Sequence, residues 1–204
     1  MVNLSEFRES AARRITKPLL PILSKSRLKP NTLTWIGLAI NIVTAGIIAT
    51  NHLIIGGFLV LFSGLFDLLD GALARSTKQT TRFGAFLDST VDRLSEAALF
   101  LGLLIWYMGD ESAVEVPLIF LVLLIFLALV GSFLTSYLRA RAEGLGIKCQ
   151  VGLFTRAGRV IILALGLLLS QIPGVLLGAL LVLVVFSFVT VGQRLVHVWQ
   201  QTKD

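Results

Sequence analysis

Six long apolar stretches run through this sequence, and they restrict it to folds that place apolar helices in a membrane. The chain of 204 residues is 55% hydrophobic and only 15% charged, whereas a soluble domain carries about 25% charged residues. The stretches cover residues 33–50, 53–75, 83–109, 116–141, 157–171 and 173–197. Because a helix needs about 20 apolar residues to cross a bilayer, we predict an all-α polytopic membrane protein with six transmembrane helices, of which the fifth is short.

Lysine and arginine are distributed unevenly between the predicted connections. All 18 of them lie in the terminal segments, around the linkers 76–82 and 142–156, or at the adjoining helix ends. The connection near 110–115 carries only acidic charges. Since cytoplasmic loops are rich in lysine and arginine, we predict a multi-pass protein of the cell membrane with both termini in the cytoplasm. The net charge of +6 then marks the cytoplasmic face and does not indicate binding to nucleic acid.

Residues 1–30 differ from the rest of the chain. Apolar side chains recur there at helical spacing, at Leu4, Phe7, Ala11 and Ile15. This pattern predicts an amphipathic juxtamembrane helix on the cytoplasmic leaflet. The four residues from Lys29 to Thr32 are expected to form a turn with a possible cap before the first crossing. Residues 31–200 would then form the six-helix membrane bundle.

Four aspartates stand at the ends of the second and third apolar stretches. Asp67 and Asp70 are three residues apart and share one helix face, and Asp88 and Asp92 are four apart and share a face of the next helix. The linker 76–82 allows these two helices to run antiparallel. The four carboxylates are therefore expected to converge near the cytoplasmic surface of the membrane, so that an active site there would face the cytoplasm.

Carboxylates in a membrane need compensation. Each one costs roughly 2.5–3.5 kcal/mol at the centre of a membrane helix, and four together also repel one another. Divalent cations such as Mg²⁺ or Mn²⁺ are the natural counter-ions for these oxygen ligands, and two of them would hold a pyrophosphate. Small residues beside the cluster, Gly71 and Ala74, leave room for a ligand, and Arg75 offers donors to phosphate oxygens.

The same residues carry a family signature. The pattern D-x2-D-G-x2-A-R-x8-G-x3-D-x3-D is met at every fixed position, by Asp67, Asp70, Gly71, Ala74, Arg75, Gly84, Asp88 and Asp92. In this stretch the chain resembles the CDP-alcohol phosphatidyltransferase family, and the resemblance extends over residues 1–204 as a single domain. The resemblance implies a homodimer in membrane lipid that makes phospholipid.

The family resemblance also implies a role for each residue. Asp67, Asp70, Asp88 and Asp92 would bind a pair of Mg²⁺ or Mn²⁺ ions, and Asp92 would also act as the general base toward the acceptor hydroxyl. The donor would be CDP-diacylglycerol or CDP-archaeol, and CMP would leave. Contacts to this CDP-linked lipid would come from Asn31, Thr32, Gly71, Ala74, Arg75 and Thr81.

Three further segments are similar to prokaryotic family members that use inositol phosphate. They are Ser136 to Glu143, Arg156 to Arg159, and Gln193 to Trp199. By that resemblance Arg139, Arg156 and Arg194 would bind the phosphate of inositol 1-phosphate, the expected phosphorylated polyol acceptor. Ala157 and Gly158 stand where the pattern carries a glutamate, so glycerol 3-phosphate stays open as an alternative acceptor.

A divalent-cation transporter is the alternative from another functional class, because aspartates inside a membrane also line cation pathways. A transporter needs access from both faces of the membrane. The predicted carboxylates lie at the cytoplasmic ends of their helices, and the outer halves of those helices lack polar partners. The sequence therefore favours the transferase.

Overall fold

The computed structural model describes residues 30–76, 81–109 and 116–203, apart from the side chains of residues 68, 70–71 and 74–76. This part of the chain is helical throughout except for its connections. The helices are α3 (Pro30–Ala49), α4 (Leu53–Ser76), α5 (Arg82–Gly109), α6 (Leu118–Gly144), α7 (Arg156–Leu168) and α8 (Val175–Gln201). Their bounds follow the six apolar stretches closely. The amphipathic helix predicted before residue 30 lies outside the described residues.

The described helices confirm an all-α membrane protein. Helices α3, α6 and α8 are long and apolar enough to cross a membrane, and α4 contains a shorter apolar run, Leu53–Asp67. Helix α7 has 13 residues, or about 20 Å of helix, which is less than the roughly 30 Å of a hydrocarbon core. Six complete crossings therefore stay a prediction.

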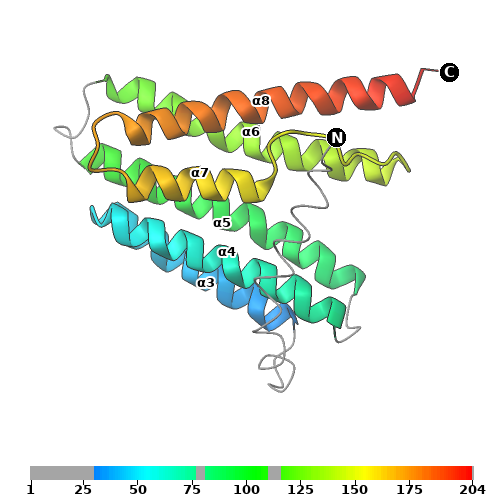
Figure 1. Cartoon of the computed structure of the whole chain (residues 1–204), viewed down its shortest axis with the longest axis horizontal. Coiled ribbons are helices and arrows are strands. Elements are labelled where there is room, and N and C mark those ends of the chain that lie inside the picture. The colour runs from blue at the N-terminus through cyan, green and yellow to red at the C-terminus, as the bar shows by residue number, and fades with distance from the viewer. Residues whose placement is uncertain (1–29, 77–80, 110–115, 204) are drawn as a thin grey trace.

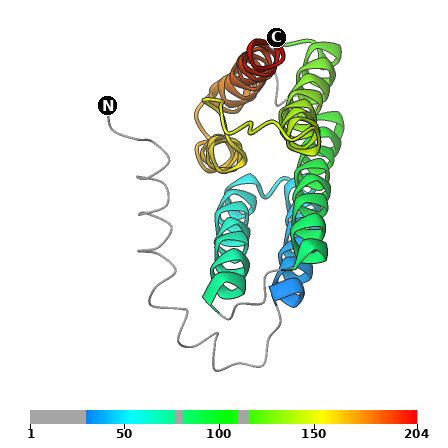
Figure 2. The same ribbon diagram turned by 90° about the vertical axis from the view of Figure 1, so that its right-hand side faces the viewer.

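The six helices form a closed ring in the order α3, α4, α7, α8, α6 and α5, because each packs mainly against two neighbours. Figure 1 shows that they run roughly side by side. Figure 2 looks along them and shows α3, α5 and α6 on one side of the ring and α4, α7 and α8 on the other. The ring brings helices that are distant in sequence, such as α4 and α7, into direct contact.

Apolar and polar side chains divide the interior of the ring. The main apolar cluster contains Ile48 of α3, Val60 of α4, Leu103 of α5, Leu121 of α6 and Leu180 of α8. Buried polar residues gather toward the opposite end of the same helices, at Asn41, Ser63, Ser95, Glu96, Ser132, Thr135, Arg159, Thr190 and Arg194. The aspartates lie at this polar end, so the apolar cluster holds the helices together beneath the candidate site.

The start of α3 differs from the prediction. The described part of the helix begins at Pro30, so Asn31 and Thr32 lie within its first turn and not in a turn before it. Proline suits this place because the first helical residues have no intrahelical partner for their N–H groups. As a result Asn31 is carried on a helix and is held close to the start of α5.

Helices α3 and α5 pack closely at Gly102, and this contact yields a stability prediction. A Cβ atom at Gly102 would overlap the main chain of Ala45, whereas a Cβ at Gly46 would meet nothing within 4 Å. Gly102→Ala should therefore lower the free energy of unfolding by about 1–3 kcal/mol through overpacking. Gly46→Ala should leave it unchanged or raise it by up to about 1 kcal/mol.

Thermal unfolding of both variants in the same detergent tests this pair. Equal transition temperatures for Gly102→Ala and Gly46→Ala would show that the crossing at Ala45 does not limit how closely α3 and α5 pack.

Candidate functional site

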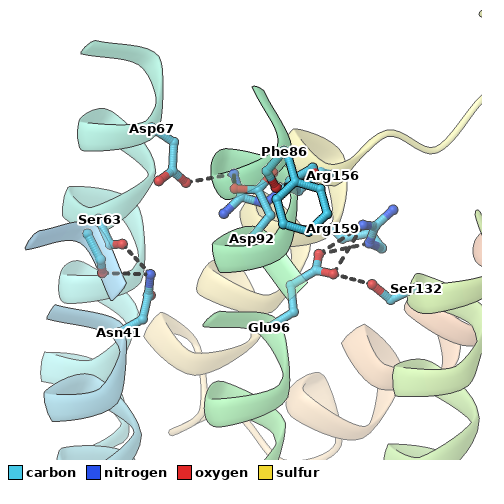
Figure 3. A network of polar contacts seen from close by, with 11 residues as sticks. Asn41, Ser63, Asp67, Phe86, Asp92, Glu96, Ser132, Arg156 and Arg159 are labelled. Atoms are coloured by element: carbon cyan, nitrogen blue, oxygen red, sulfur yellow. Dashed lines mark hydrogen bonds and ion pairs between the residues drawn. The ribbon is translucent and has the colours of Figure 1, made fainter. Parts of the chain in front are cut away.

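Two of the predicted aspartates meet on one arginine. Nη1 of Arg156, the first residue of α7, lies 2.7 Å from Oδ2 of Asp67 on α4 and 3.0 Å from Oδ1 of Asp92 on α5. Figure 3 shows the three side chains directed toward one another from three different helices. All three are partly buried, with 18–25% of each side chain exposed. The site is thus reachable from outside yet shielded enough for charges to interact strongly.

The other two aspartates are placed by their helices. Asp88 is partly buried one turn before Asp92 on α5, and the side chain of Asp70 is outside the described residues. Among the described side chains, no group of three His, Cys, Asp or Glu residues is arranged to hold a metal ion. Arg156 instead supplies the positive charge that bridges Asp67 and Asp92.

This donor set fits a hard divalent cation. Carboxylate oxygens from two helices converge on a single positively charged nitrogen, and such oxygens are the ligands that Mg²⁺ and Mn²⁺ prefer. A carboxylate in such a site can also accept a proton, and the neighbouring guanidinium can bind a phosphate. The arrangement is therefore suited to chemistry on phosphate esters.

The predicted CDP contacts are described in part. A Cβ atom on Gly84 would lie 3.0 Å from Oγ1 of Thr81 and 3.2 Å from Oδ1 of Asn31, so these three residues are neighbours. The Gly84 N–H donates a hydrogen bond of 2.9 Å to Thr81 Oγ1. Thr32 is exposed in the first turn of α3. Of the other predicted contacts, Gly71, Ala74 and Arg75, the structure describes only the helical backbone.

The predicted acceptor arginines occupy three different environments. Arg156 contacts the aspartates, as described above. Arg194 of α8 is buried and donates from Nε to the carbonyl oxygen of Val151 at 3.0 Å and from Nη1 to that of Thr135. Arg139 of α6 is about half exposed and pairs with Glu143 on its own helix at 2.9 Å. The three arginines do not converge on one point in this conformation.

A second ion pair, which the sequence pattern did not predict, lies beneath the aspartates. Arg159 donates from Nε to Glu96 Oε1 at 3.0 Å and from Nη2 to Glu96 Oε2 at 3.2 Å. Only 6–7% of either side chain is exposed. Ser132 donates to the same carboxylate (Figure 3). Arg159 Nη1 donates to Thr135 Oγ1 at 3.1 Å. The position of Glu96, four residues after Asp92, was the signal that could have revealed it.

A neutral polar pair lies on the other side of the aspartates. Asn41 of α3 donates to Ser63 Oγ and to the carbonyl oxygen of Gly37. Both side chains are buried, and Ser63 lies one turn before Asp67 on α4 (Figure 3). A satisfied amide of this kind is stable in a buried setting, so the pair joins α3 to α4 just beneath Asp67.

Comparisons with known proteins identify the family of the chain. The family model for CDP-alcohol phosphatidyltransferase matches residues 27–191. The archaetidylinositol phosphate synthase of Methanothermobacter thermautotrophicus is 36% identical over 98% of this chain and 96% of its own. The phosphatidylinositol phosphate synthase of Mycobacteroides abscessus is 40% identical over 89% of this chain and 82% of its own.

Solved structures resemble the whole bundle. The crystal structure of Mycobacterium tuberculosis phosphatidylinositol phosphate synthase with CDP-DAG bound has a TM-score of 0.77 and 36% identity, and the match covers 91% of this chain and 94% of that one. The same enzyme in complex with manganese and citrate has a TM-score of 0.79, with 90% and 88% covered. With the complete aspartate signature on α4 and α5, these matches show that the chain is a transferase of the CDP-alcohol phosphatidyltransferase family.

Proposed function

We propose that this enzyme transfers the lipid-bearing phosphoryl group of a CDP-linked lipid to a hydroxyl of inositol 1-phosphate. The observation that carries the proposal is the meeting of Asp67 and Asp92 with Arg156 at the polar end of the ring. Relatives named for archaetidylinositol phosphate and phosphatidylinositol phosphate support the acceptor. Because these relatives differ in their lipid, the donor is CDP-diacylglycerol or CDP-archaeol.

In the proposed reaction an oxygen of the acceptor forms a bond to the lipid-bearing phosphorus. The bond between that phosphorus and the bridging oxygen of the pyrophosphate breaks, and CMP leaves with the electron pair. Asp92 accepts the proton of the attacking hydroxyl, which is the role of a positioned general base. Its place on α5 next to Arg156 puts this base beside a group that can bind the acceptor phosphate.

Asp67, Asp70, Asp88 and Asp92 are the residues that we expect to hold a pair of Mg²⁺ or Mn²⁺ ions. Such ions stabilise negative charge on the attacking and leaving oxygens. The convergence of Asp67 and Asp92 on one cationic nitrogen supports this role, and a solved relative is a complex with manganese and citrate. Contacts to the CDP moiety are assigned to Asn31, Thr32, Gly71, Ala74, Arg75 and Thr81.

Arg139, Arg156 and Arg194 are proposed to bind the acceptor phosphate. The guanidinium of Arg156 keeps an unused donor, since its buried Nε has no hydrogen-bond partner among the described residues. A phosphate oxygen would satisfy that donor, and arginine binds phosphate through several N–H groups at once. The exposed pair of Arg139 with Glu143 can open without exposing a buried charge.

The arrangement in the membrane is part of the same proposal. We expect six crossings in the cell membrane, with both termini and the aspartates at the cytoplasmic face and residues 1–30 along that face. All 18 lysines and arginines lie in the terminal segments, around the linkers 76–82 and 142–156 or at the adjoining helix ends, and this distribution supports the orientation. A homodimer is proposed by analogy with the family.

An acceptor panel tests the function directly. Purified protein with Mg²⁺, CDP-diacylglycerol and labelled inositol 1-phosphate should yield labelled lipid and an equal amount of CMP. Glycerol 3-phosphate, free inositol and serine should react at least about tenfold more slowly, because a missing or misplaced phosphate leaves buried donors unpaired.

Faster reaction with glycerol 3-phosphate would replace the proposed acceptor by its alternative. Metal uptake into proteoliposomes without nucleotide, together with no lipid product from any acceptor, would support a cation transporter and overturn the proposal.

A further inference from the structure

We propose that Glu96 is a positioning residue, which acts through Arg159 to hold Arg156 against the aspartates. The inference rests on the proposed function, since it concerns how the acceptor-binding arginine is placed. It begins from a repeated spacing: Glu96 follows Asp92 by four residues on α5, and Arg159 follows Arg156 by three on α7. Each acidic residue faces one arginine, so α5 and α7 are joined by two successive ion pairs.

The two ion pairs differ in how firmly they are held. The Glu96–Arg159 pair is 6–7% exposed, has two donor nitrogens on two carboxylate oxygens, and gains further hydrogen bonds from Ser132 and to Thr135. The pair of Arg156 with Asp92 is 19–25% exposed, and in the part of the chain that the structure describes Nε of Arg156 has no hydrogen-bond partner. The Glu96–Arg159 pair is therefore the more firmly held of the two. In the Asp92–Arg156 pair, Arg156 can exchange a carboxylate for a ligand.

Helix α7 reaches α5 through long side chains. Helix α7 packs mainly on α4 and α8, so the long side chains of the two ion pairs bridge the distance to α5. The helix also starts at Arg156 itself, and the side chain of the preceding residue, Thr155, makes no capping hydrogen bond. Arg156 is directed by its own contacts with Asp67 and Asp92, and the anchored fork of Arg159 one turn later restrains the helix face that carries it.

The segment before α7 is attached to α8 by two hydrogen bonds. The N–H of Leu153 donates to Gln193 Oε1 at 3.0 Å, and that of Phe154 donates to Thr190 Oγ1 at 3.1 Å. These bonds fix where the chain enters α7 against α8. The rotation of α7 about its axis decides whether residue 156 faces Asp67 and Asp92, and the buried Arg159 restrains it together with the apolar face of Leu163, Ala164 and Leu167.

A double substitution separates positioning from stability. Glu96→Met with Arg159→Met removes both charges and keeps apolar volume, and such replacements of buried ion pairs are often neutral or stabilising. We expect a folded protein with the wild-type thermal transition and an unchanged KM for CDP-diacylglycerol. The KM for inositol 1-phosphate should rise about tenfold or more, because small misplacements of a binding group have large effects.

If the double variant does not fold, single alanine substitutions at two buried serines test the role of Glu96. Ser132 on α6 and Ser187 on α8 are both fully buried, but only Ser132 donates to Glu96, and the Ser187 hydroxyl has no partner. Ser132→Ala should raise the KM for inositol 1-phosphate, and Ser187→Ala should leave it at the wild-type value.

A folded double variant with the wild-type KM for inositol 1-phosphate would overturn the inference. If the double variant does not fold, the same KM in both serine variants would overturn it. Wild-type turnover is measured first and separates the two proposals. A wild-type enzyme that uses no acceptor contradicts the proposed function, while an active enzyme with these unaffected variants contradicts only the role of Glu96.

Discussion

Replacing Asp92 with asparagine should stop turnover while the protein stays folded. The carboxylate of Asp92 lies 3.0 Å from Arg156 at the polar end of the ring, and we assign it the proton of the acceptor hydroxyl. An asparagine amide has nearly the same shape but cannot accept that proton. Since general base catalysis contributes about 10²–10⁴-fold, kcat should fall by at least that factor, measured as CMP released from CDP-diacylglycerol with inositol 1-phosphate.

Ser89→Ala is the matched control for Asp92→Asn. Ser89 lies on the same helix, and its hydroxyl donates only to the carbonyl oxygen of Phe86 in that helix, so the control should keep wild-type turnover. Near-normal activity of Asp92→Asn would remove Asp92 from the role of base. If the variant loses Mn²⁺ binding together with turnover, its effect is that of a lost metal ligand.

Replacing Asp67 with asparagine should abolish metal binding, and this can be measured without any reaction. Asp67 of α4 contacts Arg156, the same arginine that Asp92 of α5 contacts. Loss of even an outer-shell partner lowers metal affinity about 10–100-fold, so loss of an anionic ligand should lower it by at least about 100-fold. Electron paramagnetic resonance of free Mn²⁺ in a titration with detergent-solubilised protein and CDP measures the affinity.

Glu143→Gln serves as the control for charge alone. It removes a carboxylate that is exposed and pairs with Arg139 at the end of α6, and it should leave Mn²⁺ affinity unchanged. Chelation by EDTA should stop wild-type turnover, and added Mg²⁺ or Mn²⁺ should restore it. Equal Mn²⁺ affinity of Asp67→Asn and the wild type would show that Asp67 is not a ligand.

Local patterns in the sequence were sufficient to predict the helices and the four aspartates of the candidate site. A transmembrane helix satisfies its own backbone hydrogen bonds, so the length of an apolar stretch predicts it without knowledge of its neighbours. Likewise, spacings of three and four residues put Asp67 with Asp70, and Asp88 with Asp92, on shared helix faces. The start of α3 was placed less well, because Pro30 is compatible both with a turn and with the first turn of a helix.

The partners of the arginines were not predictable in this way. Arg156 and Arg159 are three residues apart at the start of one helix, and both look like basic residues at a membrane surface. These partners are visible only in the folded ring, where α7 lies between α4 and α8, Arg156 meets Asp67 and Asp92, and Arg159 is buried against Glu96. The buried hydrogen bond between Asn41 and Ser63 depends in the same way on how α3 lies against α4.

By itself, the sequence determined the helices, the four aspartates and the family, because each depends on residues within a few turns of one another. The closed ring, the bridging arginine and the buried Glu96–Arg159 pair were decided by the tertiary structure. These contacts join residues up to 89 positions apart. Their existence depends on the rotation and crossing of whole helices, which is set by the sum of packing around the ring.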